Sequence, residues 1–236
     1  MHLKTQALWL AIIGCLLLVR CATQSDSETD STSGPETIRF LALGDSYTIG
    51  ESVDIDQRWP VQLAEALRQR GYAVDEPTLI ARTGWTTGEL LSAIETQNPS
   101  GTFDLVSLLI GVNNQYRGAS LEAYRLEFRE LLALATAFAG GDAGRVIVLS
   151  IPDWGVTPFA EGRDREQIAT EIDRFNALNR EETQAAGARY VDVTATSREA
   201  AQDPMLIAAD GLHPSGEMYA AWVRAVLPEA LAILKD

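Results

Sequence analysis

The sequence predicts an α/β fold in which a parallel sheet of five strands is covered by helices on both faces. Five short apolar or β-branched runs alternate with longer stretches of helical periodicity between residues 38 and 234. The runs are apolar at nearly every position, which is typical of parallel strands buried on both faces. Strands that alternate with helices predict βαβ units with right-handed crossovers, and such units build a doubly wound sheet. The sequence shows no internal repeat and no second folded domain.

Strand-like and helix-like segments follow one another in chain order. The predicted strands are Ile38–Leu43, Thr78–Ala81, Leu105–Ile110, Val146–Ile151 and Tyr190–Val193. The predicted helices are Trp59–Arg70, Thr87–Glu95, Leu121–Phe138, Asp164–Ala186 and Ser215–Leu234. Ser120 and Ser215 suit helix N-caps, and Gly71 and Gly187 fall where helices should end.

Polar residues and glycines follow the predicted strands. Ser46, Gly84, Asn113 and Asp153 each fall just past a strand end. Ligands of open parallel sheets bind beyond the carboxyl ends of the strands. We therefore expect a functional site at this edge of the sheet.

Two short segments carry groups suited to nucleophilic catalysis. Ser46 stands at an expected helix start, where free amides face a developing oxyanion. The chain has two histidines, and His2 lies in an expected leader, so His213 is the candidate base. Asp210 is close enough along the chain to hold the imidazole tautomer. The alternative roles are an N-cap serine and a turn aspartate, and we expect Asp45 to bind nearby backbone amides.

Four short blocks occur in a fixed order. They are Gly44-Asp45-Ser46, Gly84 within Arg82-Thr83-Gly84-Trp85, Gly111-Val112-Asn113-Asn114, and Asp210-Gly211-Leu212-His213. In this order they resemble the SGNH hydrolases, also called the GDSL esterase/lipase family, over about residues 38–232. The resemblance implies a three-layer α/β/α, flavodoxin-like sheet with the strand order 2-1-3-4-5. Asn114 departs from the pattern, since the family usually has aspartate there.

The resemblance also implies the roles of individual residues. Ser46, Asp210 and His213 would form a catalytic triad. The Ser46 amide, Gly84 and Asn113 would form the oxyanion hole, because glycine permits close backbone approach and an asparagine amide donates without charge. The alternatives are a turn glycine at Gly84 and a loop-capping amide at Asn113.

Aromatic residues past the strand ends are candidates for the substrate pocket. Trp85, Tyr116 and Trp154 could line the acyl or the alcohol side of a cleft, although aromatic residues more often serve packing. Trp59 and Trp222 lie in predicted helices and are expected in the core.

The favoured function is a serine esterase that forms an acyl-enzyme from a small-molecule ester, an acylated lipid or an acylated sugar. A thioesterase, a lysophospholipase and a carbohydrate acetylesterase share this mechanism. A non-catalytic envelope binding module on the same fold is the alternative from another class. A nucleotide-binding role is disfavoured, because the phosphate-binding glycine motifs are absent, and so is an α/β-hydrolase, because a Gly-x-Ser-x-Gly elbow is absent.

Composition excludes several partners. The formal net charge of −14 argues against binding of nucleic acid, which depends on basic patches. One histidine outside the leader and scattered carboxylates give no zinc-like spacing, so we expect no metal and no cofactor. Both cysteines, Cys15 and Cys21, lie near the N-terminus, which leaves no internal disulfide.

The N-terminal segment predicts export to the cell envelope. Residues 1–20 read as a signal peptide, residues 21–36 as a polar disordered tether, and residues 37–236 as the hydrolase domain. A cysteine at the border of an apolar run resembles a bacterial lipoprotein, so Cys21 is a candidate for lipid attachment to a membrane. Ile12-Ile13-Gly14-Cys15 matches the local pattern better, but apolar residues follow it. Plain cleavage near Ala22, or an uncleaved anchor, are the alternatives.

Overall fold

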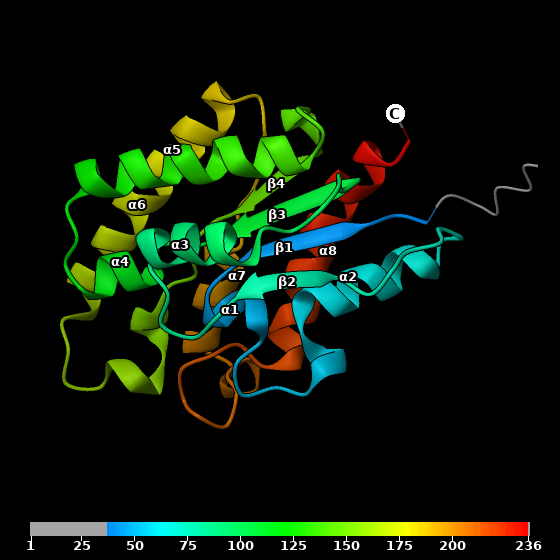
Figure 1. Cartoon of the computed structure of the whole chain (residues 1–236). Helices are drawn as coiled ribbons and strands as arrows, with labels where there is room; N and C mark the ends of the chain where they lie inside the picture. The colour runs from blue at the N-terminus through cyan, green and yellow to red at the C-terminus, as the bar shows by residue number, and fades with distance from the viewer. Residues whose placement is uncertain (1–36, 236) are drawn as a thin grey trace, which may run out of the picture. The chain divides into compact units, whose positions relative to one another are not determined.

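The strands form one parallel sheet in the order β2-β1-β3-β4-β5 in a computed structural model of the chain (Figure 1). The structure describes residues 37–235. The strands are β1 (Phe40–Gly44), β2 (Thr78–Ala81), β3 (Leu105–Leu109), β4 (Val146–Leu149) and β5 (Arg189–Val191). The predicted fold and strand order are confirmed. The predicted signal peptide, the tether and the attachment residue Cys21 lie outside the described residues.

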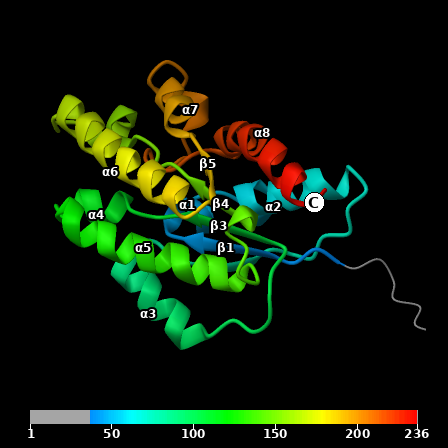
Figure 2. The same ribbon diagram turned by 90° about the horizontal axis from the view of Figure 1, so that it is seen from above.

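Helices cover both faces of the sheet (Figure 2). On one face α3 (Thr87–Gln97), α5 (Leu121–Phe138) and α6 (Arg165–Ala185) lie side by side. On the other face α2 (Trp59–Arg68) packs against α8 (Gly216–Ile233). The shorter helices are α1 (Ser46–Ile49), α4 (Val112–Tyr116) and α7 (Thr194–Arg198). Within residues 37–235, none of the helices combines the length and the apolar character needed to cross a membrane.

The predicted elements differ from the structure at their ends and in the short helices. Helices α4 and α7 have five residues each, which is too few to show a helical period in the sequence. Strand β4 ends at Leu149, before the predicted Ile151, because the Ile151 amide donates to the side chain of Asn176 at 2.7 Å. Ser120 and Ser215 are N-caps as predicted, and each side-chain oxygen accepts from the amide three residues on, at 3.2 and 3.3 Å.

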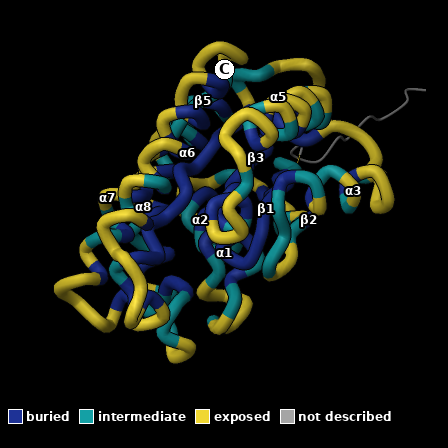
Figure 3. Tube along the Cα trace, turned by 90° about the vertical axis from the view of Figure 1, so that its left-hand side faces the viewer, coloured by how far each residue is buried: buried dark blue, intermediate teal, exposed yellow. Residues whose placement is uncertain are grey.

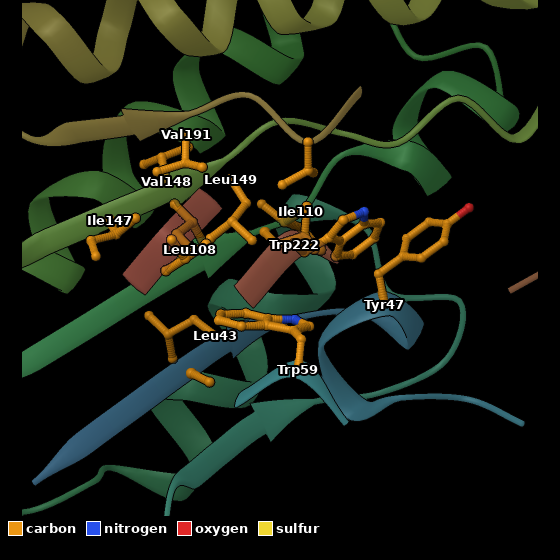
Figure 4. Close-up of a cluster of buried hydrophobic side chains, with 14 of the residues drawn as sticks. Leu43, Tyr47, Trp59, Leu108, Ile110, Ile147, Val148, Leu149, Val191 and Trp222 are labelled. Atoms are coloured by element: carbon orange, nitrogen blue, oxygen red, sulfur yellow. The ribbon is translucent and has the colours of Figure 1, made fainter. Parts of the chain in front are cut away.

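The central strands are the most deeply buried part of the molecule. Every residue of β1, β3 and β4 is buried, whereas the edge strands β2 and β5 are partly exposed (Figure 3). Trp59 and Trp222 are fully buried as predicted (Figure 4). The Tyr47 ring is also buried, and its centroid lies 6.2 Å from that of Trp222. The short helix that begins at Ser46 is thereby anchored in the core.

Gly111 fixes the path of the chain between β3 and α4. Its φ is +127°, and a Cβ atom there would lie 2.4 Å from the Tyr124 hydroxyl oxygen and 2.8 Å from Cδ1 of Ile151. Gly118 also has a positive φ, +72°, but a Cβ atom there would meet nothing within 4 Å. A Cβ atom at Gly111 would therefore meet both backbone strain and overpacking, whereas one at Gly118 would meet backbone strain without overpacking.

We expect Gly111→Ala to destabilise the protein more than Gly118→Ala. Positive φ alone costs about 1–2 kcal/mol for a residue with a Cβ atom, and overpacking adds about 1–3 kcal/mol. Urea unfolding of both variants measures the difference. Equal losses of free energy of unfolding would show that the Tyr124 side chain yields freely to the new methyl group.

Candidate active site

Ser46 lies where β1 ends and α1 begins. The preceding Asp45 caps the helix, because its Oδ1 accepts a hydrogen bond from the Tyr47 amide at 3.0 Å. Ser46 is buried, and within residues 37–235 its own amide N–H makes no hydrogen bond. This amide is consequently available to a ligand at the edge of the sheet.

His213 is presented by a hairpin that directly precedes α8. The Ala208 amide donates to the His213 carbonyl at 2.8 Å, and the Ser215 amide donates to the Leu206 carbonyl at 2.9 Å. These bonds close a tight loop around Asp210. The sequence separation of three residues therefore becomes a direct side-chain contact.

The Asp210 carboxylate holds the imidazole from one side. Its Oδ2 lies 2.6 Å from His213 Nδ1, and its Oδ1 accepts from the amides of Leu212 and His213 at 2.9 and 3.0 Å. Partial burial acts to raise the pKa of Asp210, but these hydrogen bonds outweigh it and lower the pKa well below its usual value. An ionised carboxylate at Nδ1 keeps the proton there and leaves Nε2 free to act as a base.

Ser46 and His213 line the same pocket, which has a volume of about 170 Å³. Its lining residues come from the loops after β1, β2, β3 and β4 and from the hairpin: Ser46, Tyr47, Thr83, Gly84, Val112, Asn113, Tyr116, Trp154, Phe159, Leu212 and His213. The structure thus brings together Ser46, Gly84, Asn113 and His213 at the edge predicted from the sequence.

Two further residues that line this pocket have hydrogen-bond donors to spare. Gly84 has a φ of +86°, and within residues 37–235 its amide N–H has no partner, while its carbonyl accepts from Arg117 Nη2 at 2.6 Å. The Asn113 side chain donates one N–H to the Trp85 carbonyl at 2.9 Å. Because an amide nitrogen carries two hydrogens, the second remains available.

Asn114 points away from the pocket and has a structural role. Its Oδ1 accepts from the Thr87 amide at 3.0 Å, and its Nδ2 donates to the Thr87 hydroxyl at 2.7 Å. That hydroxyl in turn donates to the Glu127 carboxylate. An aspartate at position 114 would accept like Glu127 and could not donate, so the single Thr87 hydrogen would face two carboxylates. The amide therefore suits this chain, in which Glu127 is the neighbour.

Three aromatic rings form one wall of the pocket. The centroids of Tyr116, Trp154 and Phe159 lie 5.4–6.2 Å apart. The Arg163 guanidinium lies 5.0–5.5 Å from each centroid and donates to the Tyr116 hydroxyl at 2.9 Å. Arg163 thus joins the loop after β4 to α4 through a cation–π cluster.

Trp85 lies elsewhere than the sequence suggested. It lines a shallow groove beside α3 with Glu89 and Arg117, and it is not among the residues that line the pocket of Ser46. Only its backbone contributes to the site, as the acceptor for Asn113. The Trp85 amide closes a turn onto the Arg82 carbonyl at 3.2 Å, and after this turn Gly84 lines the pocket while Trp85 lines the groove.

Several residues that line the pocket were not predicted from the sequence. Thr83, Val112 and Leu212 are direct neighbours of motif residues, and this position in the sequence could have identified them. Phe159 had a different signal, since it follows Pro158 in a loop past a strand end and is 43% exposed. Asp153, which was singled out by its place past a strand end, accepts from Arg198 Nε at 2.9 Å and supports the loop.

No group of three or more histidine, cysteine, aspartate or glutamate side chains in residues 37–235 is arranged to hold a metal ion. The expectation that catalysis needs no metal and no cofactor stays a prediction.

Comparisons with known proteins support the resemblance. The sequence model of the GDSL-like lipase/acylhydrolase family matches residues 42–221. An arylesterase from Vibrio mimicus is 33% identical over 90 residues, which is 37% of this chain. That match spans 44% of the relative's own length, so the chain aligns with less than half of this curated protein.

Solved structures share the fold at low identity. TesA superposes with a TM-score of 0.65 and 19% identity, over 83% of this chain and 99% of its own. A lipolytic protein of the G-D-S-L family from Veillonella parvula has a TM-score of 0.63 and 17% identity, over 81% of this chain and 97% of its own. An acetylxylan esterase from Geobacillus stearothermophilus has a TM-score of 0.63 and 20% identity, over 82% of this chain and 94% of its own.

Asp45 makes the stability of the protein depend on pH. Burial raises the pKa of its carboxyl to about 7 from 3.8, although the amides of Tyr47 and Asp45 donate to it. The folded protein therefore holds an extra proton between these values. The contribution of Asp45 to stability is complete below pH 3.8 and is lost as the pH rises to about 7.

We expect Asp45→Asn to remove this loss. The free energy of unfolding of the variant, relative to the unaltered protein, should rise by about 3 kcal/mol between pH 4 and 7. Urea unfolding across this range measures it, and Asp75→Asn, at an exposed aspartate, is the matched control. If the free energies of unfolding of Asp45→Asn and the unaltered protein differed by the same amount at every pH, the proposed proton uptake at Asp45 would be contradicted.

Proposed function

Because the chain belongs to the GDSL-like lipase/acylhydrolase family, we propose that it is a serine esterase that cleaves carboxylic esters through a covalent acyl-enzyme. The observation that carries the proposal is the 2.6 Å contact between His213 Nδ1 and Asp210 Oδ2, at a pocket that Ser46 also lines. Oriented imidazole, ionised carboxylate and a hydroxyl at one pocket are the parts of a Ser–His–Asp triad.

In the proposed reaction, Ser46 Oγ attacks the ester carbonyl while His213 Nε2 removes the hydroxyl proton. The ionised Asp210 stabilises the imidazolium that results. The imidazolium then protonates the leaving alcohol, and the acyl group remains on Ser46. A water molecule, activated by the same imidazole, attacks the acyl-enzyme and releases the carboxylic acid.

The proposed oxyanion hole has three donors. They are the amides of Ser46 and Gly84, which lack partners within residues 37–235, and the second N–H of the Asn113 side chain. Asn113 is already fixed by its bond to the Trp85 carbonyl, so its orientation costs nothing at the moment of reaction. The hydrogen bond from Arg117 holds the Gly84 carbonyl in the same way.

The pocket favours small ester substrates. Its volume of about 170 Å³ lies below the roughly 300–1,000 Å³ of ordinary small-molecule sites and near the roughly 150 Å³ of a cavity that holds benzene. We propose short acyl groups or a single aromatic ring as the group bound there. An arylesterase relative and an acetylxylan esterase neighbour agree with small groups, while the long acyl chains of lipids fit less well.

We expect Ser46→Ala to abolish hydrolysis of p-nitrophenyl acetate and to leave the melting temperature nearly unchanged. His213→Gln should be comparably inactive, because members of a triad act as a unit. The unaltered protein should also lose activity as the acyl chain of the p-nitrophenyl ester is lengthened. Activity is measured by release of p-nitrophenol.

Labelling of the protein by a fluorophosphonate provides the deciding measurement. Mass spectrometry should find the label on Ser46 and none on the Ser46→Ala variant. A folded, unlabelled and inactive protein would favour the non-catalytic binding module. A double variant of Ser46 and His213 much slower than either single variant would contradict the shared triad.

We expect Asn113→Ala to lower kcat with little change in KM. The loss of one oxyanion donor typically costs about 10²–10³-fold in kcat. Asn114→Ala is the matched control, because the neighbouring amide points to Thr87 instead. That variant should mainly lose stability. The buried Thr87 amide N–H would be left without its acceptor, which should lower the free energy of unfolding by about 1–3 kcal/mol. The opposite pattern would mean that Asn114 is the oxyanion donor.

A further inference from the structure

We propose that Ser52 is a positioning residue that holds the Asp210 carboxylate in place for the esterase reaction. This inference rests on the function proposed above. The Ser52 hydroxyl donates to Asp210 Oδ2 at 2.7 Å, on the same oxygen that contacts His213 Nδ1. Ser52 belongs to none of the four sequence blocks, and its role follows from the structure alone.

Ser52 supplies the contact that reaches Asp210 from a distant part of the chain. Within residues 37–235 the carboxylate has four hydrogen-bond partners: the amides of Leu212 and His213, the His213 ring and the Ser52 hydroxyl. The first three belong to the hairpin of Asp210 itself, while Ser52 is 158 residues away. Among the described residues, the other groups that oppose rotation of the Asp210 carboxylate are Leu212 and His213, which move with the hairpin.

The backbone at Ser52 indicates that its side chain is needed. Ser52 has a φ of +66°, a conformation that glycine adopts at lower cost. The preceding residue is held in place, since the Glu51 amide donates to the Ser46 carbonyl at 3.0 Å and the Glu51 carboxylate accepts from the Thr83 hydroxyl. Ser52 thus keeps a costly backbone conformation next to a fixed residue, and its hydroxyl bonds to the Asp210 carboxylate. We infer that the hydroxyl itself is needed at this position.

The hydroxyl also adjusts the charge that Asp210 presents to the imidazole. Burial acts to raise the pKa of Asp210, and the hydrogen bonds from His213, Leu212 and Ser52 lower it. Loss of the Ser52 bond leaves more negative charge on Oδ2 for the imidazolium. Since the reaction needs neutral imidazole, the acid limb of the kcat/KM profile should then move to higher pH.

Other ionisable groups face the same region and stay constant across the variants. The centroid of the Tyr47 ring lies 5.5 Å from that of the imidazole, and burial raises the pKa of Tyr47 and Tyr219, so both are neutral near pH 7. The carboxyl groups of Asp45, Asp153 and Asp210 also act to raise the pKa of Tyr47, and the Arg58 guanidinium acts to lower the pKa of Tyr219. Since Asp45 titrates near pH 7, the test compares shifts between variants and uses no absolute midpoint.

The test uses three substitutions at Ser52 in the full chain. Ser52→Ala removes the hydroxyl, Ser52→Gly removes it and relieves the backbone strain, and Ser52→Asn replaces it with an amide donor that tolerates positive φ. Ser92→Ala is the matched control, since the exposed Ser92 hydroxyl donates to the Gly88 carbonyl.

Both Ser52→Ala and Ser52→Gly should lower kcat about tenfold, the size expected for one hydrogen bond to a charged group. KM should change little, and the acid limb should move to higher pH in both. Ser52→Asn should restore most of kcat, and Ser92→Ala should match the unaltered protein. Wild-type kcat and pH profile in Ser52→Gly would overturn the inference, because only backbone strain would then matter.

A spectroscopic measurement separates this inference from the proposed function. The downfield proton resonance of His213 Nδ1–H, assigned by its absence in His213→Gln, should shift in Ser52→Gly and return toward its original position in Ser52→Asn. If Ser46→Ala is inactive but the resonance and the profile of Ser52→Gly are unchanged, this inference alone fails. If Ser46→Ala keeps its activity, the proposed function fails and this inference falls with it.

Discussion

The parallel direction of the buried strands is the constraint on which the rest of this structure depends. Because all five strands run the same way, their carboxyl ends open at one edge, and loops from distant parts of the sequence deliver Ser46, Gly84 and Asn113 to one pocket. Apolar burial of the central strands supplies the free energy for this arrangement. The edge can therefore carry features that are costly by themselves, such as the buried carboxyl of Asp45 and the positive φ of Ser52.

The site consists of two halves that are joined at more than one depth. One half, with Ser46 and the proposed oxyanion donors, follows the strands, and the other is the hairpin before α8. Below the surface, Tyr47 contacts both the His213 ring and Trp222 of α8. Nearer the surface, Ser52 bonds to Asp210, and the Phe159 amide donates to the Gly211 carbonyl at 3.0 Å. The proposed base is thus held relative to the nucleophile by packing and by hydrogen bonds together.

The sequence was sufficient for the fold and for the main residues of the pocket. Buried parallel strands are apolar at nearly every position, so β1, β3 and β4 were readable, and short-range contacts such as Asp210 to His213 follow from spacing. The direction of a side chain at a loop was less accessible: Trp85 and Tyr116 both follow strands, yet only Tyr116 lines the pocket. Ser52 could not be found at all, because its contact crosses 158 residues and depends on a left-handed backbone.

The aromatic wall held by Arg163 has a consequence for the diversification of this family. Tyr116, Phe159 and Arg163 lie on the rim, are not part of the sheet, and contact none of the proposed triad residues by hydrogen bonds within the described chain. Amino-acid changes among them can remodel the entrance while the nucleophile, base and oxyanion donors keep their places. Natural variation in substrate range among relatives should accordingly accumulate in α4 and in the segment after β4, and laboratory evolution toward bulkier esters should start there.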